Sequence, residues 1–100
     1  MTKIVFIGLV LLANVASAVD CPASKVVNIQ VHPHSILFKL QNQNWHRLGI
    51  PGEQGVAEMY SALLAAQMSG KRVVVRYPGE YDCAAYETET DPQMIRIYND

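Results

Sequence analysis

The sequence predicts a small, mainly β domain with a single helix. Three observations support this fold class: several short runs are rich in β-branched residues, one longer run is rich in Ala and Leu, and Gly, Pro and Asn separate the runs. The chain has 100 residues and shows no internal repeat and no low-complexity segment. We therefore expect one domain.

The first eighteen residues have the pattern of a secretory signal peptide. Lys3 precedes an apolar run from Ile4 to Ala13, and Ala16-Ser17-Ala18 forms a small-x-small cleavage site. The run is too short to span a bilayer, which requires ~20 apolar residues. We expect cleavage after Ala18, which leaves residues 19–100 as an exported domain, either secreted or retained in the periplasm.

The two cysteines, Cys21 and Cys83, predict one disulfide. An even number of cysteines in an exported chain is typical of disulfide bonding. A domain this small buries only roughly 60–65% of the surface that its unfolded chain exposes, so a cross-link would add needed stability. The competing interpretation is a metal or redox pair, but the Cys-x-x-Cys spacing of such sites is missing.

The first half of the domain predicts strands and loops. Val26–Val31 and Ser35–Gln41 alternate in polarity, which is typical of strands. His32-Pro33-His34 predicts a hairpin or bend between them, because proline cannot donate a hydrogen bond in a central ladder. Asn42–Gly52 is mostly loop by composition, with a possible short third strand at Trp45–Leu48.

The second half predicts the helix and the last two strands. Glu53–Ser69 is rich in Ala and Leu, and Gly70 follows it as a natural helix end. Lys71–Tyr77 and Met94–Tyr98 predict strands, and the polar, acidic segment Pro78–Pro92 connects them. The element order is therefore three strands, one helix and two strands.

This order is that of an OB-fold, a small five-stranded Greek-key barrel with a helix between strands 3 and 4. A generic α+β sandwich has the same order and remains an alternative. In an OB barrel the first and fourth strands are neighbours. A bridge between Cys21 and Cys83 would then join the start of the first strand to the loop after the fourth.

The predicted helix has a wide apolar arc of about 200°, whereas a single core-facing stripe needs only ~100°. Its remaining face carries small side chains and little charge. A face of this kind suits close approach to a second chain, so we predict a ring-forming oligomer with an interface at Glu58, Ala62, Ala65 and Ser69. The alternative is an ordinary solvent-exposed face.

Three segments form a distinctive combination. Ser24–Val27 opens the first strand, Met59–Lys71 ends the helix, and Arg72–Gly79 is a Val-rich strand that ends in Tyr-Pro-Gly. Together they resemble the B subunits of subtilase cytotoxin and of pertussis-like AB5 toxins. The resemblance implies an OB-fold binding subunit that assembles as a homopentamer around a helix-lined pore, recognises sialylated glycans of host cells and accompanies a toxic A subunit.

The resemblance also implies a glycan site at Ser24 and Tyr77. In that family a serine opening the first strand and a tyrosine just before Pro-Gly line the site, and these two residues match those positions. A serine hydroxyl can donate to the sialic-acid carboxylate, and a tyrosine ring can pack on the sugar. Alternatively, Ser24 caps a turn or starts the strand, and Tyr77 is a half-buried strand residue.

The chain also departs from the family. Subtilase-type B subunits carry a cysteine pair across the second and third strands, where this chain has Leu37 and Phe38, and they are longer. These departures leave the binding loops and the existence of an A subunit open. The alternative function is a small exported OB-fold protein that binds another protein in a structural or inhibitor-like role.

The charge pattern argues against a nucleic-acid partner. Without the predicted signal peptide, seven Lys and Arg residues face nine Asp and Glu residues, and the basic residues are scattered. A nucleic-acid interface requires a basic face. No second apolar run long enough to span a membrane follows the first.

The remaining candidates predict neither catalysis nor a bound metal or cofactor. His32, His34 and His46 lack a carboxylate or thiol at metal-site spacing, so turn histidines are the preferred interpretation. Trp45-His46-Arg47 is either a sugar- or partner-binding loop or a segment with a core tryptophan. Carboxylates of the acidic run, Glu87, Glu89 and Asp91, have no rigid frame for glycosidase chemistry, which predicts a solvated loop.

Overall fold

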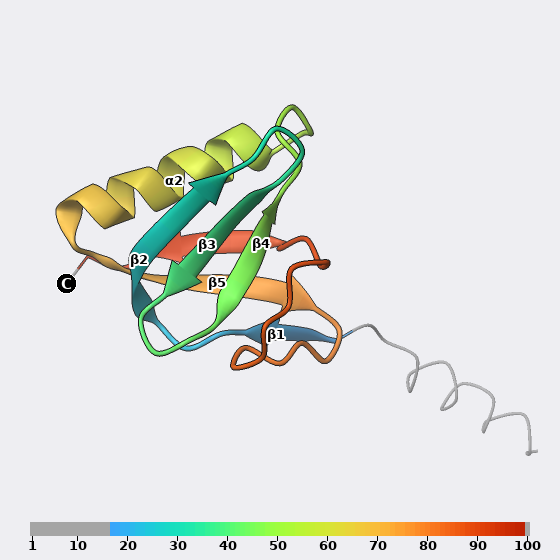
Figure 1. The fold of residues 1–100 in the computed structure, drawn as a ribbon. Helices are drawn as coiled ribbons and strands as arrows, with labels where there is room; N and C mark the ends of the chain where they lie inside the picture. Colours follow the sequence, from blue (N-terminus) through green and yellow to red (C-terminus); the bar gives the residue numbers. More distant parts are fainter. Residues whose placement is uncertain (1–16, 100) are drawn as a thin grey trace, which may run out of the picture.

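The computed structural model describes residues 17–99, which form a curled, half-barrel sheet with one helix packed against it (Figure 1). The mainly β class with one helix is confirmed. The predicted signal peptide lies outside the described residues, except for Ser17 and Ala18. The elements are β1 (Ala18–Asp20), β2 (Ser24–Val31), β3 (Ile36–Leu40), β4 (Trp45–Gly49), α2 (Val56–Ser69), β5 (Arg72–Pro78) and β6 (Met94–Ile97).

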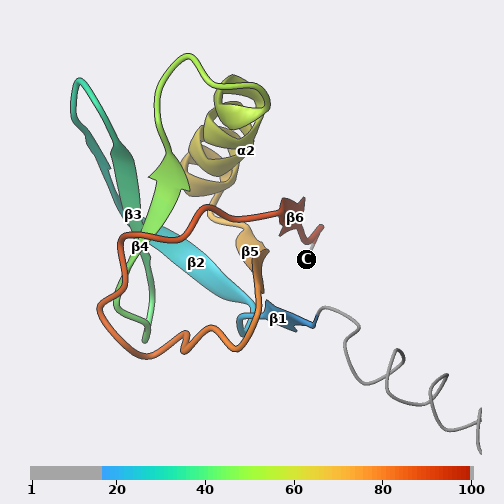
Figure 2. The same ribbon diagram turned by 90° about the vertical axis from the view of Figure 1, so that its right-hand side faces the viewer.

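The sheet runs in the order β4, β3, β2, β5, β6, and every neighbouring pair is antiparallel. The first and fourth predicted strands, β2 and β5, pair as expected, with Ser24 opposite Val73. β1 precedes β2 along the same edge of β5, because Arg76 pairs with Asp20 on one side and with Met94 of β6 on the other. Figure 2 shows β1 and β6 on opposite sides of β5.

β1 is the strand that the sequence did not predict. Val19 pairs with Tyr77, and the side chains of Asp20 and Arg76 form an ion pair with Oδ1 and Nε 2.7 Å apart. A three-residue strand carries no usable alternation of polar and apolar residues. Its position depends on β5, more than fifty residues away in sequence, so local pattern gave no signal.

The helix begins later than predicted, at Val56 instead of Glu53. Gly52 and Gly55 have φ angles of 96° and 85°, in the left-handed region, so a turn replaces the first predicted helical turn. The predicted end is confirmed. Gly70, with a φ of 70°, follows the last helical residue in the left-handed conformation that closes many helices.

The hydrophobic core lies between the sheet and α2. Leu63 and Ala66 of the helix are fully buried. Gly49, at the end of β4, lets the helix approach closely, because a Cβ there would lie 2.8 Å from Cγ2 of Val56. The core comprises Cys21, Val26, Ile36, Phe38, Leu40, Leu48, Val56, Leu63, Ala66, Val73, Val75 and Tyr77.

The predicted disulfide is confirmed. Cys21, buried just after β1, is bonded to Cys83 in the β5–β6 connection, across a sequence separation of 62. It ties the segment just before β2, the first predicted strand, to the loop after β5, as expected. A disulfide of this kind is compatible with an exported protein. Over the described part of the chain, no helix is both long and apolar enough to cross a membrane.

Candidate functional site

Tyr77 does not form the predicted sugar-binding wall. Its side chain is fully buried, and its hydroxyl donates a hydrogen bond of 2.7 Å to the backbone oxygen of Arg47. Its ring stacks on that of Tyr81, with centroids 3.9 Å apart. Burial raises the pKa of Tyr77 above its ordinary value. The prediction that this ring contacts a glycan is therefore wrong, because neither ring face nor hydroxyl is accessible.

Ser24 does not share a pocket with Tyr77. It lies opposite Val73, four residues from Tyr77 along β5, which corresponds to about 13 Å at ~3.3 Å per residue. Its half-exposed hydroxyl lies 3.4 Å from the Pro22 carbonyl and accepts a hydrogen bond of 3.2 Å from Gln43. Ser24 is thus the outer end of a buried polar network.

Gln43 and His46 form the centre of that network. The Gln43 amide nitrogen donates to the Pro22 oxygen at 2.7 Å, which orients the amide oxygen toward Nε2 of His46 at 2.9 Å. An amide oxygen only accepts, so Nε2 of His46 carries the proton. Nδ1 of His46 then accepts from the Tyr81 hydroxyl at 2.7 Å. This chain of hydrogen bonds joins the start of β2, β4 and the β5–β6 connection.

His46 is held in its neutral form. Its side chain has no exposed surface, and burial lowers its pKa to about 4, an effect that the nearby negative charge of Glu87 partly offsets. The surrounding rings are Phe38, Tyr77 and Tyr81, all with centroids within 5.6 Å. Trp45–Arg47 therefore lies in strand β4, the short third strand that the sequence allowed, and not in a binding loop, with His46 in the core and Trp45 half-buried.

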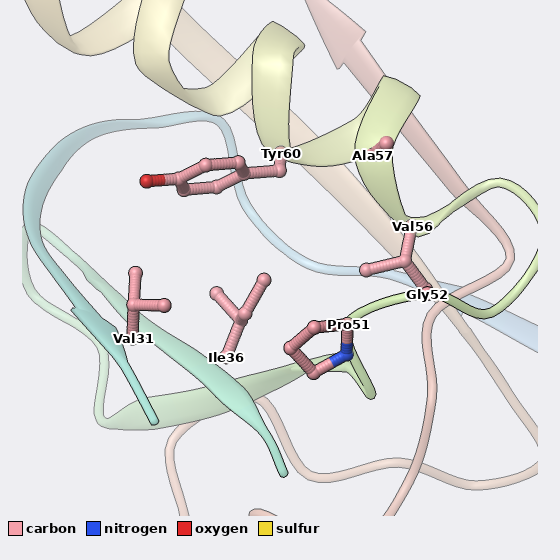
Figure 3. A pocket seen from close by; sticks show the side chains of 7 residues that line it. All are labelled: Val31, Ile36, Pro51, Gly52, Val56, Ala57 and Tyr60. Atoms are coloured by element: carbon pink, nitrogen blue, oxygen red, sulfur yellow. The ribbon is translucent and has the colours of Figure 1, made fainter. Parts of the chain in front are cut away.

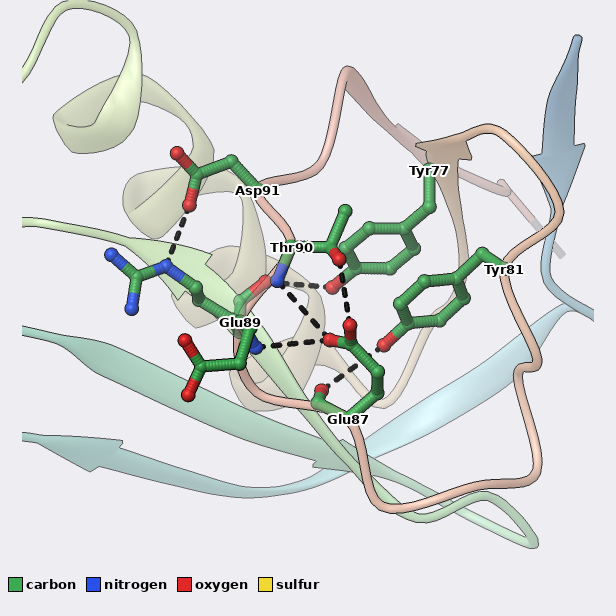
Figure 4. Close-up of polar contacts among 7 residues, drawn as sticks. Tyr77, Tyr81, Glu87, Glu89, Thr90 and Asp91 are labelled. Carbon is green, nitrogen blue, oxygen red and sulfur yellow. Dashed lines mark hydrogen bonds and ion pairs between the residues drawn. The ribbon is translucent and has the colours of Figure 1, made fainter.

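The acidic run after Cys83 is an organised loop rather than a freely solvated one (Figure 4). The Glu87 carboxylate accepts hydrogen bonds from the backbone of Glu89 and Thr90 and from the Thr90 hydroxyl. These bonds, opposed by partial burial, lower the pKa of Glu87. Asp91 forms an ion pair with Arg47 of β4, with Oδ1 and Nε 2.6 Å apart. The Glu87 carboxylate thus orders the loop internally, and the Asp91 carboxylate holds it onto β4.

An open cavity lies beside the start of α2. It has a volume of about 210 Å³ and lies between the β2–β3 hairpin, the β4–α2 loop and the start of α2. Tyr60 extends over Val31 and Ile36, and the lining is otherwise aliphatic (Figure 3). The lining residues are Val31, Ile36, Pro51, Gly52, Val56, Ala57 and Tyr60. We call this cavity the apolar pocket.

Exposed apolar side chains lie around the apolar pocket and on the helix beside it. Val31 at the pocket and Val27 on the same strand are 56% and 47% exposed, and Met68 on α2 is 86% exposed. Gln67 of the helix donates to the Val27 carbonyl, so β2 and α2 lie side by side. Several exposed apolar side chains on two neighbouring elements are typical of interaction sites.

The helix face predicted as an oligomer interface is largely exposed. Glu58, Ala65 and Ser69 are exposed, whereas Ala62 is half-buried. Ser69 satisfies its hydroxyl internally, by donating to the Ala65 carbonyl at 2.8 Å. The interface itself stays a prediction.

The three histidines lie apart. His32 and His34 are exposed in the β2–β3 turn, where the His32 amide donates to the Ser35 carbonyl, whereas His46 is buried in β4. The predicted hairpin or bend is therefore confirmed. Between residues 17 and 99, no group of three or more metal-binding side chains is present.

Sequence reasoning missed both the apolar pocket and the His46 network. The residues of the pocket come from three segments that meet only in the folded chain. From the sequence, each residue is interpreted only as part of its own strand, loop or helix. The one available signal was the apolar arc of the predicted helix. This arc includes Ala57 and Met68 and is wider than a single core-facing stripe requires. A lone Gln three residues before a His carries no comparable signal.

The comparisons with known proteins leave the chain without an assigned family. No protein-family model, no curated protein sequence and no solved structure matches it. The resemblance to AB5 toxin B subunits therefore stays a hypothesis.

Proposed function

We propose that this chain is an exported, non-enzymatic binding module that docks a protein partner on the apolar pocket and the adjacent face of α2. The observation that carries the proposal is the open pocket of about 210 Å³ lined by carbon-rich side chains. Covering an exposed aliphatic side chain contributes roughly 1.5–3 kcal/mol. Val31 and Met68 are both exposed enough to supply such a contribution.

The chemistry of the apolar pocket favours a protein over a sialylated glycan. No Lys, Arg or His lines it, so nothing there would balance the carboxylate of a sialic acid. The Tyr60 ring and the aliphatic side chains of Val31 and Ile36 suit an apolar side chain instead. Specific protein interfaces commonly centre on one such anchor in a pocket.

We also propose that the domain is an OB-fold. The order β4, β3, β2, β5, β6, with α2 between β4 and β5, is the arrangement expected of that fold. The barrel is open between β4 and β6. A single parallel bridge from His46 of β4 to Glu87 in the β5–β6 connection spans part of this opening.

Peptide display on the oxidised mature protein tests the docking proposal. We expect selected peptides to share one large apolar residue and to bind Val31→Glu at least about tenfold more weakly, because a loss of ~1.4 kcal/mol produces that change. Ile97→Glu, at an exposed apolar position on β6, is the matched control. Selected peptides that bind both variants equally well would contradict the proposal.

A second candidate, a homopentameric subunit that binds sialylated glycans, is favoured by the OB-like strand order. Ser24 retains a half-exposed hydroxyl, although Tyr77 is unavailable. A sialylated-glycan array should then give signal with the wild type that Ser24→Ala loses, and the native mass should equal five chains. An array without signal, or a monomeric or dimeric mass, would exclude this candidate. A toxic A subunit belongs to the same proposal.

A further inference from the structure

We infer that the protein partner of the apolar pocket is a second copy of this chain, bound through antiparallel α2 helices with Met68 of each copy in the pocket of the other. This inference rests on the proposed function of the pocket as a docking site. Three observations support a second copy as the partner: the spacing of residues on α2, the size of the pocket and the charges at the two ends of α2.

The exposed side of α2 carries a seam with coiled-coil spacing. Ala57, Ser61, Leu64 and Met68 follow one another at intervals of four, three and four residues, so they share one face of the helix. All are exposed except Leu64, which is half-buried. Of the two central residues, Ser61 is small and lets the helices approach, and Leu64 offers an apolar side chain to the contact.

A two-fold axis through the middle of this seam places Met68 of each copy, the knob, opposite the apolar pocket of the other copy, the hole. Ala57 and Met68 are eleven residues apart, or about 16 Å along the helix at ~1.5 Å per residue. In an antiparallel pair, Met68 of one copy therefore lies over Ala57 of the other. Ala57 and Tyr60 line the apolar pocket, so each copy offers one knob and one hole.

Met68 is suited to be the inserted side chain. It is the most exposed large apolar residue described, at 86%. Its flexible, unbranched thioether can adapt to a cavity that the pair forms without designed shape matching. The volume of about 210 Å³ accommodates one such side chain.

The charges at the ends of α2 complement one another in the same arrangement. Glu53 precedes the helix, Glu58 lies in its first turn, and Lys71 follows its end. Lys71 donates a hydrogen bond to the neutral side chain of Asn99. Antiparallel pairing places the acidic end of each helix beside the basic end of the other and opposes the helix dipoles.

This arrangement differs from the predicted ring. A ring would use the side of α2 that carries Ala62 and Ser69, whereas the two-fold pair uses the adjoining side, which carries Leu64 and Met68. The two sides make opposite predictions for a charge at position 68. Such a charge disrupts the pair and leaves a ring interface at Ala62 intact.

Sedimentation equilibrium of the oxidised mature protein tests the inference. One helix pair with two knobs is smaller than the ~1,600 Å² of a standard interface, so the association is weak and the series should reach about 1 mM. We expect a reversible dimer that Met68→Lys converts to a monomer. Tyr86→Lys replaces another exposed apolar residue, in the β5–β6 connection, and should leave the dimer intact.

A photoreactive diazirine side chain at position 68 locates the contact. We expect a cross-link to Tyr60 or Val31 of a second, isotopically labelled copy. The seam separation of about 16 Å puts the pocket of the same chain beyond its reach. A cross-link that maps to another surface would overturn the inference.

The outcomes separate this inference from the proposed function. A wild type that is monomeric at about 1 mM, yet selects peptides in a Val31-dependent manner, overturns the second copy and keeps the docking site. A dimer that survives Met68→Lys also overturns the inference. A five-chain mass overturns it in favour of the ring, and a monomer that selects no peptide overturns both proposals.

Discussion

Replacing Cys21 and Cys83 together by alanine is expected to lower the free energy of unfolding by about 4 kcal/mol. The bridge closes a loop across a sequence separation of 62, and the loss of that closure gives the unfolded chain more conformational entropy. A domain of this size has a total stability of only ~4–12 kcal/mol. The loss therefore amounts to between about a third and all of the stability of the wild type.

Urea denaturation of the oxidised wild type and the double variant measures this effect. The wild type unfolded in the presence of a thiol reductant is the control, because reduction removes the same bond without changing the sequence. A loss below about 1 kcal/mol would mean that the unfolded, reduced chain retains the β1–β5 pairing. Loop entropy would then not be the main contribution of the disulfide to stability.

The second large effect is a loss of stability of about 3 kcal/mol as the pH falls from 7 to 4, caused by His46. Burial lowers its pKa from an ordinary 6.5 to about 4 in the folded state. The unfolded chain therefore takes up the proton first. The stabilisation is complete above pH 6.5 and is lost as the pH falls toward 4.

His46→Gln isolates that contribution. It removes the titrating ring, so its free energy of unfolding should vary less between pH 6.5 and 4 than that of the wild type, although its absolute stability is lower. His34→Gln, at an exposed turn position, is the matched control. Asp20, whose pKa is lowered in the folded state by Arg76, acts in both proteins and cancels in the comparison, whereas Glu87 interacts with His46 and belongs to the contribution that the variant removes. Equal pH slopes for His46→Gln and the wild type would contradict the assignment.

The polar network explains why protonation of His46 destabilises the folded chain. A protonated His46 would become a donor at Nδ1, where it now accepts from the Tyr81 hydroxyl, and its charge would lie among aromatic rings. The network joins β2, β4 and the β5–β6 connection, so its loss loosens the closure of the half barrel.

The sequence by itself determined the features that depend on local pattern. The alternation in Val26–Val31, the Ala-rich run that ends at Gly70 and the Val-rich run before Tyr77 each encode one element. Their order and the even cysteine count were sufficient for the fold class and the Cys21–Cys83 bond. The elements follow from the chemistry of residues close together in the chain, and the bond follows because the chain has only these two cysteines.

Only the tertiary structure decided where side chains lie relative to residues distant in sequence. From the sequence, Tyr77 is either a half-buried strand residue or part of a sugar site. In the fold, the Tyr81 ring stacks on it and the Arg47 carbonyl binds its hydroxyl, so it is fully buried. β1 exists because β5 offers it an edge. The apolar pocket exists because the β2–β3 hairpin, the β4–α2 loop and the start of α2 meet there. Burial and cavities are properties of how elements pack, and no local pattern specifies them.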